Sequence, residues 1–183
     1  MHHLLGPSDI LAFWFDEIEP AQWWRVDPVF DAGIRERFGS LHQVGMQGEM
    51  FAWRTGAEGR LAEIIVLDQF SRNMHRGTAR AFAADPMALA LAQEAVGRAD
   101  DKKLDPDRRA FLYMPYMHSE SRLIHEQALT LFRSLGVPAN LDSEIRHKAI
   151  IDRFGRYPHR NAVLGRPSTE EELQFLEQPG SSF

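Results

Sequence analysis

The sequence predicts an all-α protein, built from antiparallel helical hairpins that stack on one another as in α-solenoids. Three observations support this fold class. Apolar residues recur at helical spacing in several segments, and Asp-Pro pairs and glycines stand where such helices would start and end. Strand signals are nearly absent, because no alternating run of β-branched residues exceeds four and neither Asn-Gly nor Asp-Gly occurs.

Three segments show one apolar face most clearly. Their apolar positions follow the i, i+3, i+4, i+7 rule, which places them on one side of a helix. No fixed-period repeat accompanies them, so the stacking is inferred from segment length rather than from repetition. The stripes are Leu61, Ile64 and Ile65; Ala88, Leu91, Ala92, Ala95, Val96 and Ala99; and Ile124, Ala128, Leu131 and Leu135.

The expected helix ends have physical causes. An Asp accepts hydrogen bonds from free first-turn N–H groups, and a Pro at the first helical position lacks the N–H that would stay unpaired. This pattern predicts helix starts at Asp27-Pro28, Asp85-Pro86 and Asp105-Pro106. Gly136 followed by Pro138 predicts a helix end, and the next helix should run from near Leu141 to Phe154-Gly155. Thr169 and Glu172 predict a capping box at the start of a short last helix.

Composition excludes several classes of protein. The 183 residues fit one domain, expected over 1–183 with a frayed tail at 178–183, and 44% hydrophobic content with 26% charge is ordinary for a globular protein. The absence of cysteine excludes disulfides, iron–sulfur clusters and thiol nucleophiles. The longest apolar run, Ile10 to Phe15, is far too short to span a membrane, and residues 1–6 show no signal peptide. We therefore expect a cytoplasmic protein, and no motif predicts a metal or another cofactor.

Two basic segments stand out in a chain whose formal charge is −5. Residues 153–161 contain three Arg and one His, and no acidic residue occurs between Asp152 and Glu170. Residues 72–77, also free of acids, follow an apolar helix. Such segments predict either a site for an anion or carboxylate, or an arginine network that holds loops together.

Asp68 is the most informative single position. It shares a helix face with Leu61, Ile64 and Ile65, where the pattern calls for an apolar side chain. Because an unpaired buried carboxylate is costly, we expect Asp68 to be buried and bonded to an Arg. Arg72 is the local candidate, and an Arg of residues 153–160 is the distant one. A structural clamp and a functional site both fit this pattern.

His118 and Glu120 follow an apolar run that contains Pro115. We expect Pro115 to break or kink the helix there and to release carbonyl groups near His118. A His and a carboxylate two residues apart could act as an acid–base pair, or they could satisfy the loop in which they lie. Their spacing to His125 does not match His-Glu-x-x-His, which argues against a metal site.

Aromatic residues gather near the N-terminus in the triplet Phe13-Trp14-Phe15. Successive helical residues turn by about 100°, so the three rings cannot all face one core. Either the triplet lies between two layers, or one ring belongs to an apolar groove or a self-association surface that would form a homodimer.

Four stretches together resemble a bacterial family known as domain of unknown function 924. They are residues 13–15, 67–77, 111–120 and 153–169, and the resemblance covers nearly the whole chain. It implies a helical fold similar to tetratricopeptide-repeat (TPR) proteins, that is, a TPR-like α-α superhelix in a single compact domain. It implies no activity, cofactor or catalytic residue. The chain departs from the family pattern at Ser71, where Pro is usual, and at His75, where an aromatic residue is usual.

Three functions remain open at this point. The first is a binding module whose Asp/Arg/His cluster holds a small anionic ligand or a peptide carboxylate. The second is a hydrolase or lyase in which His118 works with Glu120 or Asp68 while arginines stabilise an oxyanion. The third is RNA contact with stacking on Tyr157, against which the net acidity argues. The expected ligand-binding residues are Asp68, Arg72, Asn73, Arg76, His118, Glu120, Arg156, His159 and Arg160.

Overall fold

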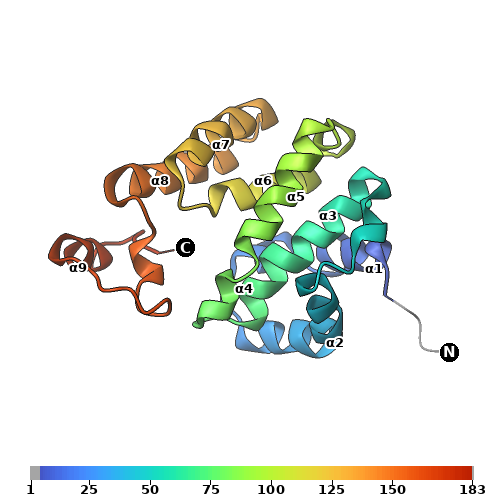
Figure 1. The fold of residues 1–183 in the computed structure, drawn as a ribbon, viewed down its shortest axis with the longest axis horizontal. Helices are drawn as coiled ribbons and strands as arrows, with labels where there is room; N and C mark the ends of the chain where they lie inside the picture. Colours follow the sequence, from blue (N-terminus) through green and yellow to red (C-terminus); the bar gives the residue numbers. More distant parts are fainter. Residues whose placement is uncertain (1–4, 183) are drawn as a thin grey trace.

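The computed structural model describes residues 5–182, and these residues are helical with no β-strand (Figure 1). The all-α prediction is therefore confirmed. The α-helices are α1 (Pro7–Ala12), α2 (Pro28–Met46), α3 (Ala57–Ile65), α4 (Ser71–Met74), α5 (Asp85–Gly97), α6 (Pro106–Met117), α7 (Arg122–Leu135), α8 (Pro138–Phe154) and α9 (Glu170–Leu176).

Shorter helical pieces join these helices. Two are π-helical, η1 (Phe13–Glu17) and η4 (Val66–Phe70), and each directly continues the preceding α-helix. The others are 3₁₀ turns, namely η2 (Pro20–Trp24), η3 (Phe51–Thr55), η5 (Ala79–Phe82), η6 (Asp101–Lys103) and η7 (Pro158–Arg160). Because π-helical turns often occur at functional positions, η4 and its Asp68 are of interest for the site.

Helix α3 lies at the centre of the molecule. It contacts α1, α5 and α6, and all of its residues from Ala57 to Ile65 except Glu58 are buried. Gly59 is required there, since a Cβ atom at this position would come within 1.9 Å of the Trp53 carbonyl oxygen. The central helix is thus covered on nearly every face, and its two buried charged residues, Arg60 and Glu63, form ion pairs with Asp100 and Arg54.

The chain passes from α1 and α2 at one end of the molecule to α8 and α9 at the other (Figure 1). In the second half, α5 contacts α6, α6 contacts α7 and α7 contacts α8, so consecutive helices pack as expected for stacked hairpins. In the first half, by contrast, α1 packs on α3 and α2 packs on α4. The regular geometry of a TPR superhelix stays a prediction.

Most of the predicted helix ends are confirmed. Asp27 accepts hydrogen bonds from the N–H groups of Val29 and Phe30, and Asp105 accepts one from Arg108. Gly136 and Gly155 end α7 and α8 in the left-handed conformation that favours glycine. The capping box of Thr169 and Glu172 opens α9 as predicted.

Three details differ from the expectations. Asp85 is the first residue of α5 rather than its N-cap, which is Ala84. Helix α8 begins at Pro138 instead of near Leu141, since Pro is well suited to the first helical position. Pro115 does not end α6, which continues to Met117. The carbonyl groups of Met117 and His118 nevertheless accept bonds from other segments, from the Tyr157 hydroxyl at 2.6 Å and from Arg160 at 3.0 Å.

The aromatic triplet packs between layers of the protein. Phe13 and Trp14 are buried, and Phe15 has ring contacts with Trp23 and Phe111 at 5.8 and 5.6 Å. The position of the third ring, Phe15, is therefore explained by its packing against Trp23 and Phe111, as the alternative of a triplet between two layers requires. The self-association alternative stays a prediction.

The described part of the C-terminal tail is attached to the fold. Ser181 is buried, and its hydroxyl donates a hydrogen bond to the Leu176 carbonyl oxygen at 3.1 Å. The tail is thus tied down through this residue, contrary to the expected fraying, while Phe183 and the N-terminal residues 1–4 lie outside the described residues. Within residues 5–182, every helix is too short or too polar to cross a membrane.

Candidate functional site

Asp68 lies in the π-helical turn η4 and is completely buried, as predicted. Its Oδ1 atom accepts hydrogen bonds from Arg72 Nη1 at 3.0 Å and from His118 Nδ1 at 2.7 Å. Its Oδ2 atom accepts one from the Gln69 side-chain amide at 2.7 Å. The predicted Asp–Arg contact is confirmed, and the bond between Asp68 and His118 joins η4 to the end of α6.

Asp85 holds the two basic segments together. Its carboxylate accepts hydrogen bonds from both terminal nitrogens of Arg72, Nη1 at 2.9 Å and Nη2 at 3.0 Å. Arg160 Nη1 donates a longer bond to the same carboxylate at 3.4 Å. The Arg72 and Arg160 guanidinium groups also lie over the Phe82 ring, at 5.6 and 4.5 Å from its centroid. Two arginines that would repel each other are therefore bridged by one carboxylate and share one aromatic ring.

Glu120 completes the cluster from the loop after α6. Its carboxylate accepts a hydrogen bond from the Tyr157 backbone N–H at 2.8 Å. It also accepts one from each terminal nitrogen of Arg166, at 2.6 and 2.9 Å. We name the whole arrangement the polar junction. It consists of the carboxylates Asp68, Asp85 and Glu120, the guanidinium groups Arg72, Arg160 and Arg166, and the imidazole His118.

The electrostatics of the polar junction fix its protonation. Burial opposes ionisation of Asp68, but the charge of Arg72 and the hydrogen bonds from His118 and Gln69 outweigh it and lower its pKa to about 2. Burial and the nearby Arg72 lower the pKa of His118. Asp68 is therefore an anion at neutral pH and His118 is neutral. An ionised carboxylate only accepts, so Nδ1 of His118 carries the proton and Nε2 carries the lone pair.

Several residues expected in the site lie elsewhere. The Asn73 amide donates to Asp31 at 2.8 Å, and Arg76 forms an ion pair with the same carboxylate. Arg156 binds Glu172 with two nitrogens, at 2.6 and 2.8 Å, and so fastens α9. These contacts follow the structural alternative, in which arginines hold loops and helix ends.

His159 and Tyr157 lie next to the polar junction but face inward. Their rings are 5.6 Å apart, and burial lowers the pKa of His159 to about 4. Tyr157 is fully buried, donates its hydroxyl proton to the Met117 carbonyl and lies with the same hydroxyl 3.2 Å from His125 Nε2. Its ring is therefore covered and cannot stack on an RNA base in this conformation.

Sequence reasoning missed four members of this region. Asp85 had been assigned to helix capping, while Gln69, Phe82 and Arg166 carried no signal of their own. The acid-free stretch up to Glu170 gave a partial signal, because it implied that residues 153–160 must find acids from distant segments. Which acids these are depends on how the helices pack.

The two departures from the family pattern also have structural roles. The Ser71 hydroxyl is buried and lies 2.7 Å from His42 Nε2, so this turn is fixed without the usual Pro. His75 has a ring contact with His42 at 5.5 Å between centroids.

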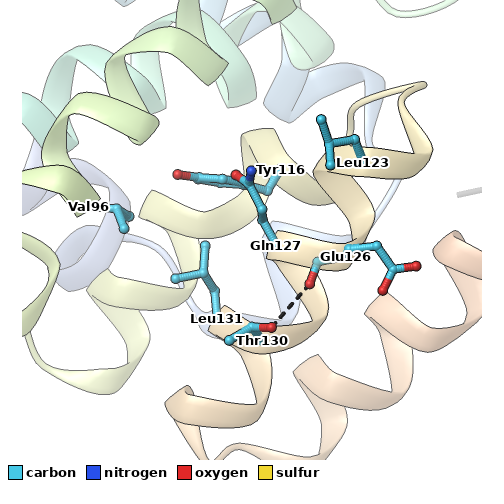
Figure 2. A pocket seen from close by; sticks show the side chains of 7 residues that line it. All are labelled: Val96, Tyr116, Leu123, Glu126, Gln127, Thr130 and Leu131. Atoms are coloured by element: carbon cyan, nitrogen blue, oxygen red, sulfur yellow. Dashed lines mark hydrogen bonds between the residues drawn. The ribbon is translucent and has the colours of Figure 1, made fainter.

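The part of the chain that the structure describes offers no metal site. No group of three or more His, Asp or Glu side chains within it could hold a metal ion. A separate hollow of ≈ 370 Å³ lies between α5, α6 and α7. Figure 2 shows Val96, Tyr116 and Leu131 in its lining, and the dashed line there marks the hydrogen bond that the Thr130 hydroxyl donates to the Glu126 carbonyl oxygen. Its lining is mainly apolar, and none of the predicted site residues reaches it.

Comparisons with known proteins agree with this description. A family model described as a bacterial protein of unknown function (DUF924) matches residues 10–180. The fold is similar to the solved structure of a protein of unknown function from Agrobacterium tumefaciens, with a TM-score of 0.89 and 40% identity over 93% of this chain and 96% of that one. No curated protein matches the sequence. The chain therefore belongs to the DUF924 family of bacterial proteins of unknown function.

Proposed function

We propose that the protein is a binding module for a small carboxylate-bearing ligand, free or at the end of a peptide, and that the ligand binds at the polar junction. The observation that carries this proposal is the incomplete pairing of Arg160. This side chain is 7% exposed, its contact with Asp85 is long at 3.4 Å, and its Nε atom has no hydrogen-bond partner among the described residues. A buried guanidinium in this state has unused capacity for an anion.

The surroundings of Arg160 support the same conclusion. Burial and the neighbouring Arg72 lower its pKa, although Asp85 and Glu120 favour its charged form. The charged form of Arg160 is therefore less favoured than that of a surface arginine, and an added anion would offset this. Asp85 indicates the chemical class that fits, because a carboxylate already lies between Arg72 and Arg160.

His118 would complete such a site. Its side chain is 15% exposed, Nδ1 is held by Asp68, and Nε2 has no hydrogen-bond partner among the described residues. When protonated, this nitrogen would donate a charge-assisted bond to an anion. Ligand binding should therefore raise the pKa of His118.

The test combines thermal melts with NMR of the histidine ring protons. Acetate, citrate and a short peptide with a free C-terminus serve as probes. A ligand at a hundred times its Kd should add about 2.7 kcal/mol of stability, and the His118 resonance should move with it. Arg160→Gln should remove both responses, whereas Arg156→Gln, which loses bonds to Glu172 and to the Pro167 carbonyl oxygen but none within the polar junction, should retain them. Unchanged melts and His118 resonances with all probes would contradict the proposal.

A second candidate function is acid–base catalysis by His118. The 2.7 Å contact with a buried, ionised Asp68 orients the ring and leaves the lone pair on Nε2, which is the arrangement of a general base. The nucleophile would be water, since the nearby Ser119 hydroxyl already accepts a bond from the Ser121 N–H.

Hydrolysis of an activated ester such as p-nitrophenyl acetate tests this candidate. His118→Gln should reduce the rate about a hundredfold or more if the imidazole is the base. His75→Gln, which alters a histidine outside the polar junction, is the matched control and should leave the rate unchanged. Equal rates in the wild type and both variants would exclude the catalytic role for this substrate class.

A further inference from the structure

We propose a second ligand site, for a small phosphate monoester, in a hollow of ≈ 470 Å³ between α2, the end of α4 and η5. Its basic lining residues are Arg35 and His42 from α2, His75 after α4, and Arg80 from η5. It shares no residue with the polar junction. The inference therefore stands apart from the function proposed above.

The first supporting observation is a charge imbalance within the hollow. Its lining includes two arginines and two histidines but no Asp or Glu. Arg35 donates to the Met74 carbonyl oxygen with Nε at 3.1 Å and Nη2 at 2.5 Å, and it forms no ion pair within residues 5–182. The exposed Arg80 side chain has neither a hydrogen bond nor an ion pair with any residue that the structure describes. The neighbouring Arg76, by contrast, is neutralised by Asp31.

The pKa values of His42 and His75 reflect the same excess of positive charge in the hollow. Burial, together with the charges of His75 and Arg80, lowers the pKa of His42 to about 4. Burial and the charges of Arg80 and Arg35 also lower the pKa of His75. No carboxylate opposes these effects at either ring. An anion in the hollow would supply the missing negative charge and would favour protonation of His75.

The geometry indicates a multiply charged anion with a small organic part. Two permanent guanidinium charges match the charge of about −1.5 to −2 that a phosphate monoester carries at neutral pH. The arginines approach from two different elements, which suits an acceptor with oxygens on several sides. Met46, Met74 and Ala83 line the same hollow and offer apolar contacts to the organic part.

His42 is positioned for a neutral role. Its Nε2 atom lies 2.7 Å from the buried Ser71 hydroxyl, which holds the ring in place. With a pKa of about 4, it stays uncharged when His75 takes up a proton. His75 is therefore the group that should respond to an anion between pH 5 and 8.

Sulfate and inorganic phosphate are the probes for the test, followed by ribose 5-phosphate as a simple monoester. Sulfate keeps its two charges throughout this range, so any change in its affinity with pH reports on the protein. We expect sulfate to raise the pKa of His75 in an NMR titration and to bind more tightly as the pH falls from 8 to 5.5. Phosphate should show a smaller gain, because it loses charge near its second pKa of about 6.

Arg80→Gln is the principal variant, since this exposed side chain supports no other part of the fold. It should weaken sulfate binding at least about tenfold, the loss expected for one charge-assisted bond. Arg133→Gln, at an exposed arginine on α7, is the matched control and should bind as the wild type does. Arg160→Gln should also leave this site intact, which separates it from the polar junction.

Two results would overturn the proposal. One is a His75 titration curve that sulfate and phosphate leave unchanged at millimolar concentration. The other is equal sulfate affinity for the wild type and Arg80→Gln, with circular dichroism showing both proteins folded. Binding of sulfate and phosphate without any gain for ribose 5-phosphate would remove the monoester and leave an inorganic anion as the ligand.

Discussion

The interior of α1 to α7 and the C-terminal arm, which we define as residues 138–182, are stabilised in different ways. The interior contains one large apolar cluster that extends from Ile10 to Leu135. The arm has a small cluster of Ile150, Ile151 and Tyr157, with Phe154 and Phe175 packed against it. The arm also packs on α7 through α8, and it carries several ion pairs, including Arg156 to Glu172 within the arm and Arg166 to Glu120 across to the loop after α6.

This difference affects where function can arise. Apolar packing is non-directional and insensitive to pH, so it fixes the position of α3 and its neighbours firmly. A region held by ion pairs and hydrogen bonds depends on protonation and on competing ligands. The polar junction lies where the two regions meet, and an anion that binds Arg160 would act on the contact between them.

The largest effect is expected in the interior. Phe70 is fully buried and packs against Phe38, with 4.9 Å between ring centroids. Phe70→Ala should lower the free energy of unfolding by about 3–5 kcal/mol, because it removes buried contacts and leaves a cavity. Phe175→Ala in the arm, where the ring is only partly buried, should cost less than half as much. Urea unfolding measures both, and equal losses would contradict the distinction between the regions.

The next effect is expected at the polar junction. Asp85→Asn removes the charge that bridges Arg72 and Arg160. We expect a loss of about 2–4 kcal/mol in urea unfolding, since two poorly solvated cations would remain without a shared counterion. Asp152→Asn, at an exposed carboxylate paired with Lys148, should change stability by less than about 0.5 kcal/mol. A neutral result at Asp85 would contradict the bridging role of this carboxylate.

Acidification should destabilise the protein, and the arm contributes most of the histidines responsible. Burial lowers the pKa of His42 and His159 to about 4 and that of His147 to about 3, below the unfolded value near 6.5. Between these values the unfolded chain binds more protons, so stability falls as the pH decreases. The loss from pH 7 to pH 6 should be about 2 kcal/mol for the three groups together.

Chemical unfolding at several pH values measures this slope. His147→Gln and His159→Gln should each flatten it, because the substituted side chain no longer titrates. Below pH 4.5 a further loss should follow as Asp68 and Glu172, whose pKa values are about 2, take up protons in the unfolded chain. Stability that is constant from pH 7 to pH 6 would show that these histidines are not buried in neutral form.

The smallest effect tests one hydroxyl group between the two regions. Tyr157→Phe removes the hydroxyl that donates to the Met117 carbonyl oxygen at 2.6 Å and lies 3.2 Å from His125 Nε2. We expect a loss of about 1 kcal/mol, the usual contribution of one hydrogen bond. Hydrogen exchange should show the change mainly in the arm. An equal increase in exchange throughout α3 would indicate that arm and interior unfold as one unit.

Much of the fold could be predicted from the sequence because its signals are local. The Asp-Pro starts at residues 27 and 105, the glycine ends at 136 and 155, and the capping box at 169 depend on a few adjacent residues and on backbone geometry. The burial of Asp68 was also predictable, since its neighbours at helical spacing are apolar. The exact start of α8 and the continuity of α6 through Pro115 were not, because packing decides between local conformations of similar energy.

The candidate site likewise has features that follow from local sequence and features that depend on packing. The residue pattern alone implies that the two acid-free basic segments need anionic partners and that Asp68 needs an Arg. The packing of the helices determines that Asp85 bridges Arg72 and Arg160, and that Arg76 and Arg156 pair with Asp31 and Glu172 outside the polar junction. A guanidinium group can pair with any carboxylate within reach, and which one is within reach depends on the helices that pack together.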